Sequence, residues 1–150
     1  MRPASPVTSV ARWIPATSLA LALAGVAVSG YLTIAHYTSP GILACSSSGL
    51  VSCELVTTSS QSVFLGIPVA VLGLAWFVGM SVLCLPASWR STDRRVHLLR
   101  VVASLLAIAF VLWLIYAELV IIGAICLWCT AAHVLAFALF AISVRAYAYS

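Results

Sequence analysis

The sequence has no lysine and only three acidic residues, and charged residues make up 7% of its 150 residues. Soluble domains average about 25% charged residues, so water cannot be the solvent for most of this surface. The seven basic residues are all arginine and are scattered between apolar runs. Nucleic-acid binding needs a clustered basic face, so we predict no nucleic-acid partner. The length allows one domain, and we assign residues 1–150 to a single membrane-embedded unit.

Four apolar stretches are long enough to cross a lipid bilayer, which needs about 20 apolar residues per helix. They cover residues 16–38, 65–85, 98–117 and 121–144. Backbone polar groups cannot stay unpaired in lipid, so these stretches should be helices. The first is too long for a secretory signal, whose apolar part runs about 7–15 residues. We predict an all-α fold, an integral membrane four-helix bundle.

The arginines indicate how the bundle is oriented. Arg2 and Arg12 precede the first span, four more lie in or beside the link between the second and third spans, and Arg145 closes the fourth. The loop 39–64 and the turn 118–123 contain no basic residue. Because cytoplasmic connections carry the arginine excess, we predict that both termini are cytoplasmic and that loop 39–64 is external. In a bacterial inner (plasma) membrane, that side is periplasmic.

Four of the five cysteines map to the predicted external side, where disulfides are permitted. Cys45 and Cys53 lie in the loop, separated by seven residues, and we call them the loop pair. Cys126 and Cys129 form the motif CLWC at the outer end of the fourth span, and we call them the helix pair. Cys84 lies at the opposite end and is predicted to be a small buried hydrophobic residue.

The CLWC motif favours chemistry over a structural staple. A bridge across two intervening residues closes a very small loop and adds little stability. At a helix N-terminus, the helix dipole and free N–H groups stabilise a thiolate. A zinc site would need all four thiolates together, and the loop spacing is wider than usual for zinc, so we predict no metal. The alternatives are a metal-binding membrane protein and a non-catalytic one with structural cysteines.

Positions 126, 129 and 133 share one stripe of an α-helix, so Cys126, Cys129 and His133 should line up. An ionisable residue within a span indicates a functional site by default. We therefore predict that His133 donates a hydrogen bond to a polar headgroup held in the bundle. The alternative is a core histidine bonded to a neighbouring helix. His36 is predicted to be interfacial, and Trp128 to belong to an aromatic belt or to shield the helix pair.

Two disulfide-capable pairs on one face indicate a relay by thiol–disulfide exchange. A protein partner can reach the loop pair from solution. The helix pair abuts lipid, where a lipid-soluble acceptor can reach it. A membrane quinone (menaquinone or ubiquinone) is the two-electron acceptor that fits this position. We predict a membrane oxidoreductase that acts on protein thiols, with a quinone as its acceptor.

These residues resemble the vitamin K epoxide reductase family in its bacterial form. The resemblance rests on the spaced cysteines Cys45 and Cys53, the stretch FLGIP at 64–68 followed by Gly73, and CLWC followed by His133. It covers nearly the whole chain. The order is specific, because the disulfide bond formation protein B family places its C-x-x-C in the first external loop instead.

The resemblance implies a four-helix bundle around a quinone, capped by the external loop. Cys45 would exchange with a thioredoxin-like partner, Cys53 would pass electrons to Cys126, and Cys129 would face the quinone. Because the sequence ends at Ser150, just after its last span, we expect that partner to be a separate protein. The implied role is disulfide formation in exported proteins rather than reduction of vitamin K epoxide.

The resemblance also implies quinone-binding residues. Gln61 and Phe64 lie in a stretch that resembles the family's quinone-contacting cap, where an asparagine often stands. His133 stands where animal members carry a tyrosine that bonds the quinone carbonyl. We expect these three side chains to contact the quinone.

Overall fold

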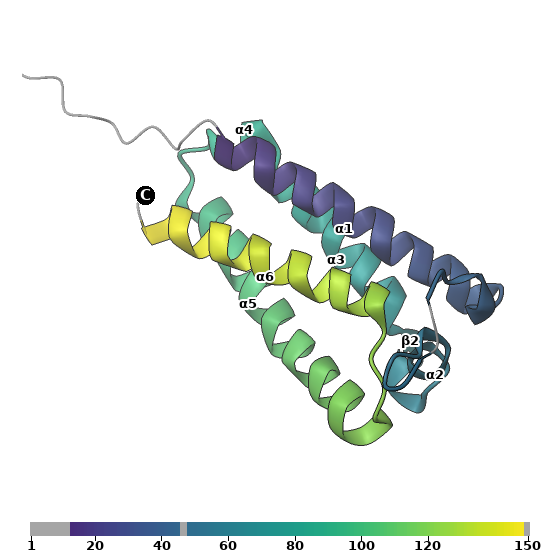
Figure 1. The fold of residues 1–150 in the computed structure, drawn as a ribbon. Helices are drawn as coiled ribbons and strands as arrows, with labels where there is room; N and C mark the ends of the chain where they lie inside the picture. The colour runs from purple at the N-terminus through teal and green to yellow at the C-terminus, as the bar shows by residue number, and fades with distance from the viewer. Residues whose placement is uncertain (1–12, 46–47, 149–150) are drawn as a thin grey trace, which may run out of the picture.

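The computed structural model describes residues 13–45 and 48–148, so Arg2 and Arg12, used for the orientation, lie outside the described residues. Figure 1 shows long helices running between two ends of the molecule. These helices are α1 (Trp13–Tyr37), α3 (Val69–Leu83), α5 (Arg94–Tyr116) and α6 (Leu127–Ala148). The short elements are η1 (Pro40–Ile42), α2 (Cys53–Thr57), η2 (Ser60–Ser62), β1 (Val63–Phe64), β2 (Ile67–Pro68), α4 (Pro86–Trp89) and the π-helical η3 (Ala117–Ile122).

Three helical segments are long and apolar enough to cross a membrane: Trp13–Tyr37, Arg94–Ile122 and Leu127–Ala148. The second of these is α5 together with η3. Helix α3 is also apolar but has 15 residues, fewer than the roughly 20 that a straight crossing needs. The fold is therefore helical and of the membrane type, as predicted, with three candidate spanning helices and one shorter apolar helix in the described residues.

The predicted second span, 65–85, starts too early. Helix α3 begins at Val69, because the preceding residues form an antiparallel hairpin of β1 and β2. Its turn residues Leu65 and Gly66 have φ of 51° and 82°, the positive values that a tight two-residue hairpin turn requires. Pro68, which cannot donate a backbone hydrogen bond, stands directly before the helix. An apolar run alone could not reveal this turn.

The predicted fourth span, 121–144, also begins in the wrong place. The preceding helix continues as η3 to Ile122, and α6 starts only at Leu127. Gly123 ends η3 in the left-handed conformation with φ of 71°, which suits glycine because it lacks a Cβ. The residues just before α6 therefore form a connection that lies across the end of the bundle. The third helix, predicted over 98–117, begins at Arg94 instead.

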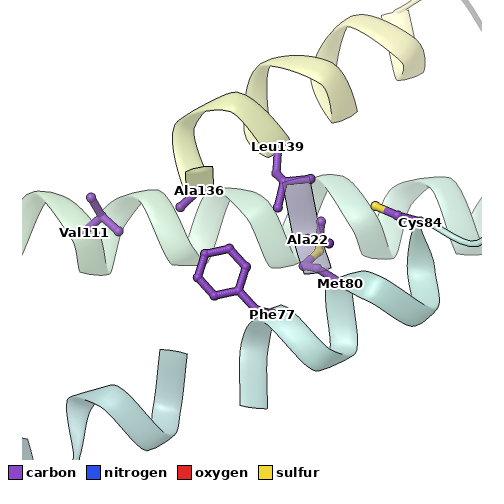
Figure 2. Close-up of a cluster of buried hydrophobic side chains, with 7 residues drawn as sticks. All are labelled: Ala22, Phe77, Met80, Cys84, Val111, Ala136 and Leu139. Carbon is purple, nitrogen blue, oxygen red and sulfur yellow. The ribbon is translucent and has the colours of Figure 1, made fainter. Parts of the chain in front are cut away.

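Helix α1 packs along α3 and α6, and α6 also packs along α5, whereas α3 and α5 touch only sparsely. In Figure 1, α5 diverges from the other helices toward the cysteine-bearing end. Gly25 permits the close approach of α1 and α3, because a Cβ there would overlap the ring of Phe77. Figure 2 shows the core that these helices share, with Cys84 among its buried side chains as predicted. The cluster comprises Ala22, Phe77, Met80, Cys84, Val111, Ala136 and Leu139.

The end of the bundle opposite the cysteines is closed by a buried arginine. Arg100 is 2% exposed, and its guanidinium donates two hydrogen bonds to the carbonyl oxygen of Leu83, at 3.1 and 2.6 Å. The guanidinium carbon lies 3.6 Å from the centroid of the Trp89 ring, a cation–π contact. The Trp89 indole in turn donates to the hydroxyl of Ser18 at 3.1 Å. These contacts join α1, α3, α4 and α5 at this end of the bundle, which we label the inner end; the cysteine-bearing end is labelled the outer end.

Candidate functional site

The loop pair forms a disulfide between Cys45 and Cys53. Cys53 is the first residue of α2, and the Ser52 hydroxyl caps that helix by accepting a hydrogen bond from the backbone N–H of Leu55 at 3.3 Å. Cys53 is buried, whereas Cys45 is half-buried. Cys45 is therefore the more accessible residue of the pair, and Cys53 faces the interior.

Backbone pairing holds the disulfide-bearing loop against the segment before α6. The N–H of Ser52 donates to the carbonyl of Ile125 at 3.1 Å, and the N–H of Ile125 donates to the carbonyl of Leu50 at 2.8 Å. These hydrogen bonds form a parallel β-bridge between Val51 and Ile125. The chain segments that follow these two residues therefore continue in the same direction. Cys53 and Cys126 follow the bridge and lie in one buried cluster. The pairing thus brings one cysteine of each pair to the same place.

Two aromatic side chains hold the segment before Cys45. The Trp128 indole donates to the carbonyl of Ala44 at 3.2 Å. The Tyr31 hydroxyl accepts from the N–H of Ala44 at 3.1 Å and donates to the carbonyl of Ile42 at 2.6 Å. The two rings meet edge to face, with centroids 4.9 Å apart. Trp128 therefore positions the loop pair, a role beyond the predicted belt or shield, and the sequence analysis did not single out Tyr31.

The helix pair consists of free thiols at the start of α6. Cys126 is fully buried and precedes the helix, while Cys129 lies half-buried in its first turn. The backbone N–H of Cys129 donates to the Cys126 sulfur at 3.3 Å. A hydrogen bond with the Cys129 thiol lowers the pKa of the Cys126 thiol, and burial opposes this effect. A lowered pKa makes it easier for the Cys126 thiol to give up its proton and become the nucleophilic thiolate.

An apolar cavity of about 380 Å³ lies between the long helices at this end, within the range of about 300–1,000 Å³ usual for ligand pockets. Side chains of α3 and α5 form its apolar walls, among them Leu72, Trp76, Leu106, Phe110 and Leu114. Polar side chains also reach the cavity, among them His36, Ser59, Gln61, Glu118 and His133. The cavity therefore suits a ligand with an apolar body and a small number of polar atoms.

The cavity collects four of the residues predicted for the site, namely Cys129, His133, Gln61 and Phe64. Phe64 lies in β1 and meets the ring of Phe110 edge to face at 5.4 Å. The loop pair and Cys126 are not among the lining residues. The predicted stripe thus holds for Cys129 and His133, one helical turn apart on α6. Cys126 directly precedes the helix and does not line the cavity.

His133 is 7% exposed, and its imidazole has no hydrogen-bond partner among the described residues. The alternative prediction of a histidine bonded to a neighbouring helix therefore finds no support within that part of the chain. Buried polar groups in proteins are almost always hydrogen-bonded. Because the His133 imidazole lines the cavity and has no partner within the described residues, it is available to a ligand there. His36, predicted to be interfacial, also lines the cavity, from α1.

Glu118 was not among the residues predicted for the site. It is 6% exposed, lines the cavity, and accepts a hydrogen bond through Oε2 from the backbone N–H of Cys126 at 3.4 Å. Ending the third span at residue 117 placed Glu118 in an exposed turn. The sequence does contain one sign of a buried acid at this position. Glu118 is the one acidic residue after position 93, and it stands beside long apolar runs.

These features define a class: a helical membrane protein with one disulfide and a pair of free cysteines, of which Cys129 lines an apolar cavity. The sequence model of the vitamin K epoxide reductase family matches residues 16–144. The match covers most of the chain, so the chain belongs to that family. The resemblance seen in the motifs is therefore confirmed, and family membership and the cysteines are together consistent with a thiol oxidoreductase.

Proposed function

We propose that the chain, acting as a single domain, is a quinone-dependent thiol–disulfide oxidoreductase that reoxidises a separate thioredoxin-like protein. The observation that carries this proposal is the continuity of the site. Cys53 of the loop disulfide shares a buried cluster with Cys126, the Cys126 sulfur accepts a hydrogen bond from the Cys129 N–H, and Cys129 lines the apolar cavity. Electrons that arrive at the loop therefore have a path of sulfur atoms that ends beside a site for an apolar ligand.

The relay proceeds by three balanced exchanges. A dithiol of the partner reduces the Cys45–Cys53 disulfide, and the partner leaves as a disulfide. The loop pair, now a dithiol, reduces a disulfide between Cys126 and Cys129. The helix pair then passes two electrons and two protons to a quinone. Each exchange breaks one disulfide or reduces one quinone and forms one new disulfide, and thiolate attack drives the first two.

Residues of the cavity match what a quinone ring presents, namely an apolar ring and two carbonyl oxygens. His133 has an imidazole with no partner in the described residues, and Gln61 supplies an amide that can donate. Phe64 and Phe110, which pack edge to face against each other, add apolar surface to the cavity. We assign the ring to this position, with Cys129 beside it. The quinone accepts the electron pair, and these side chains orient it and exclude water.

The same cavity accounts for access from the lipid. The sparse contact between α3 and α5 leaves apolar side chains of both helices along the cavity. Trp76 bounds this gap on one side by donating its indole N–H to the carbonyl of Ala103 at 3.0 Å. We propose that an apolar quinone tail leaves between these helices.

The orientation follows from the arginines. Arg90, Arg94 and Arg145 lie at or near helix ends opposite the cysteine-bearing end. By the positive-inside rule this end is cytoplasmic, so we place the cysteines on the external, periplasmic side of the inner membrane. Disulfide formation in exported proteins takes place on that side.

The experiment mixes the purified protein with a reduced thioredoxin-like protein and a menaquinone or ubiquinone analogue, and follows quinone absorbance. We expect quinone consumption equimolar with new disulfides in the partner. Quinone loss that stops after one equivalent per protein, or none at all, would falsify the proposal. It would then favour the alternative of a membrane protein with structural cysteines.

A further inference from the structure

Glu118 is a buried acid at the junction between the helix pair and the cavity. It lies in η3, and π-helical segments occur frequently at functional sites. Among the described residues, its carboxyl group has one hydrogen bond, from the Cys126 N–H, and no ion pair. An ionised carboxylate buried without a counter-charge is costly, so this site favours the group with its proton in place.

The proposed quinone reduction, on which this inference rests, needs two protons as well as two electrons. Two S–H bonds break, one S–S bond forms, and two O–H bonds form on the quinone. Cys129 lines the cavity, so its proton has a direct path. Cys126 is fully buried and does not line the cavity, so its proton needs a carrier. Glu118 touches both places, because it lines the cavity and is hydrogen-bonded to the Cys126 backbone.

We propose that Glu118 carries the thiol proton of Cys126 to a quinone in the cavity. As the disulfide forms, the carboxyl group gives its proton to one quinone oxygen and takes the proton of Cys126, so Glu118 ends in the state in which it began. The proton of Cys129 goes to the other quinone oxygen. Both electrons come from the two sulfur atoms, so no further reactant is needed.

Other titratable groups near this position are few. Cys126, Cys129 and His133 belong to α6 or the residue before it, and His36 reaches the cavity from α1. Glu54 of α2 is exposed and does not line the cavity. Among the residues that line the cavity, Glu118 is therefore the one carboxylic acid.

The first test is Glu118→Gln. Its side-chain oxygen can still accept the Cys126 N–H, but its amide cannot release a proton. We expect quinone reduction by the pre-reduced protein to slow roughly 100-fold, a usual size for general acid–base catalysis, and the solvent deuterium isotope effect to change. Glu118→Asp should restore part of the rate. Asp93→Asn is the matched control, because Asp93 caps α5 at the inner end, where asparagine caps equally well.

The second test needs no quinone. The chain has three acidic side chains, of which Glu118 is buried and Glu54 and Asp93 are exposed. Infrared spectra of the reduced, quinone-free protein should therefore show one carboxylic-acid C=O band, lost in Glu118→Gln and kept in Asp93→Asn. A missing band, or normal rates and isotope effect in Glu118→Gln, would overturn this inference alone. A wild-type protein that reduces no quinone would overturn the proposed function as well.

Discussion

The two ends of the bundle differ in how completely their buried polar groups are paired. At the inner end, Arg100 donates to the Leu83 carbonyl and stacks on Trp89, so the guanidinium is fully engaged by the protein. At the outer end, His133 has no partner within the described residues, and Glu118 has one long hydrogen bond. No fully buried side-chain nitrogen or oxygen atom of the described residues lacks a partner, so the ring nitrogens of His133 are open to the cavity that this residue lines. The difference separates an end whose polar groups hold the bundle together from an end whose polar groups are available to a ligand.

The largest expected effect is the loss of turnover at the outer end. Cys126→Ala and Cys129→Ala should each abolish quinone reduction by a reduced partner, because neither variant can form the second disulfide. Cys84→Ala, at the inner end, should keep turnover, since Cys84 packs in the core. Quinone absorbance measures all three variants. If either helix-pair variant retained turnover, the outer end would not be the catalytic end of the bundle.

The next effect concerns stability at the inner end. Arg100→Ala removes two hydrogen bonds to Leu83 and the contact with Trp89. Hydrogen bonds to charged groups are worth about 1.5–3 kcal/mol each, so for two bonds we expect the free energy of unfolding to fall by roughly 3–6 kcal/mol. Thermal unfolding in detergent measures this. The exposed Arg95→Ala serves as control and should stay near wild type, and an equal loss in both would contradict the prediction.

The packing of α1 against α3 supports both ends of the bundle. Disturbing it should lower the stability of the protein less than Arg100→Ala does. Gly25→Ala places a methyl group against the ring of Phe77, and overpacking a core costs about 1–3 kcal/mol. Gly30→Ala on the same helix meets nothing within 4 Å and should be neutral or slightly stabilising. The difference between the unfolding temperatures of the two variants measures the effect of the close approach between α1 and α3 at Gly25. If Gly25→Ala unfolded like Gly30→Ala, helix propensity alone would explain both.

The smallest expected effect tests the unpaired histidine. His133→Ala should raise the KM for quinone roughly tenfold, the equivalent of one hydrogen bond of about 1.4 kcal/mol, with a smaller change in kcat. His97→Ala, which removes the inner-end partner of Arg100, should leave this KM unchanged. Steady-state kinetics with varied quinone distinguishes them. A KM that rises equally in both variants would mean that the two ends are not separate in function.

Much of the fold was predictable, because long apolar runs have few options in lipid. The helical membrane architecture and the burial of Cys84 follow from run length and composition. The start of α3 at Val69 and of α6 at Leu127 did not follow, because the hairpin turn at Gly66 and the left-handed Gly123 are local backbone features within apolar sequence. Hydropathy does not detect such features.

The site divides in the same way. Spacing alone indicated Cys129 and His133, since one helical turn separates them. Gln61 and Phe64 came from the family resemblance, and all four line one cavity. Glu118 was missed, because only the continuation of α5 into η3 turns an apparent surface acid into a buried one.

The sequence by itself determined that this chain is a membrane protein of helices with two cysteine pairs, because composition and spacing act locally along the chain. Only the tertiary structure decided which cysteines meet and which polar groups face the cavity. The pairing of Ile125 with the loop joins segments far apart in sequence. No local pattern encodes such a contact, because it depends on how separate helices and loops pack against one another.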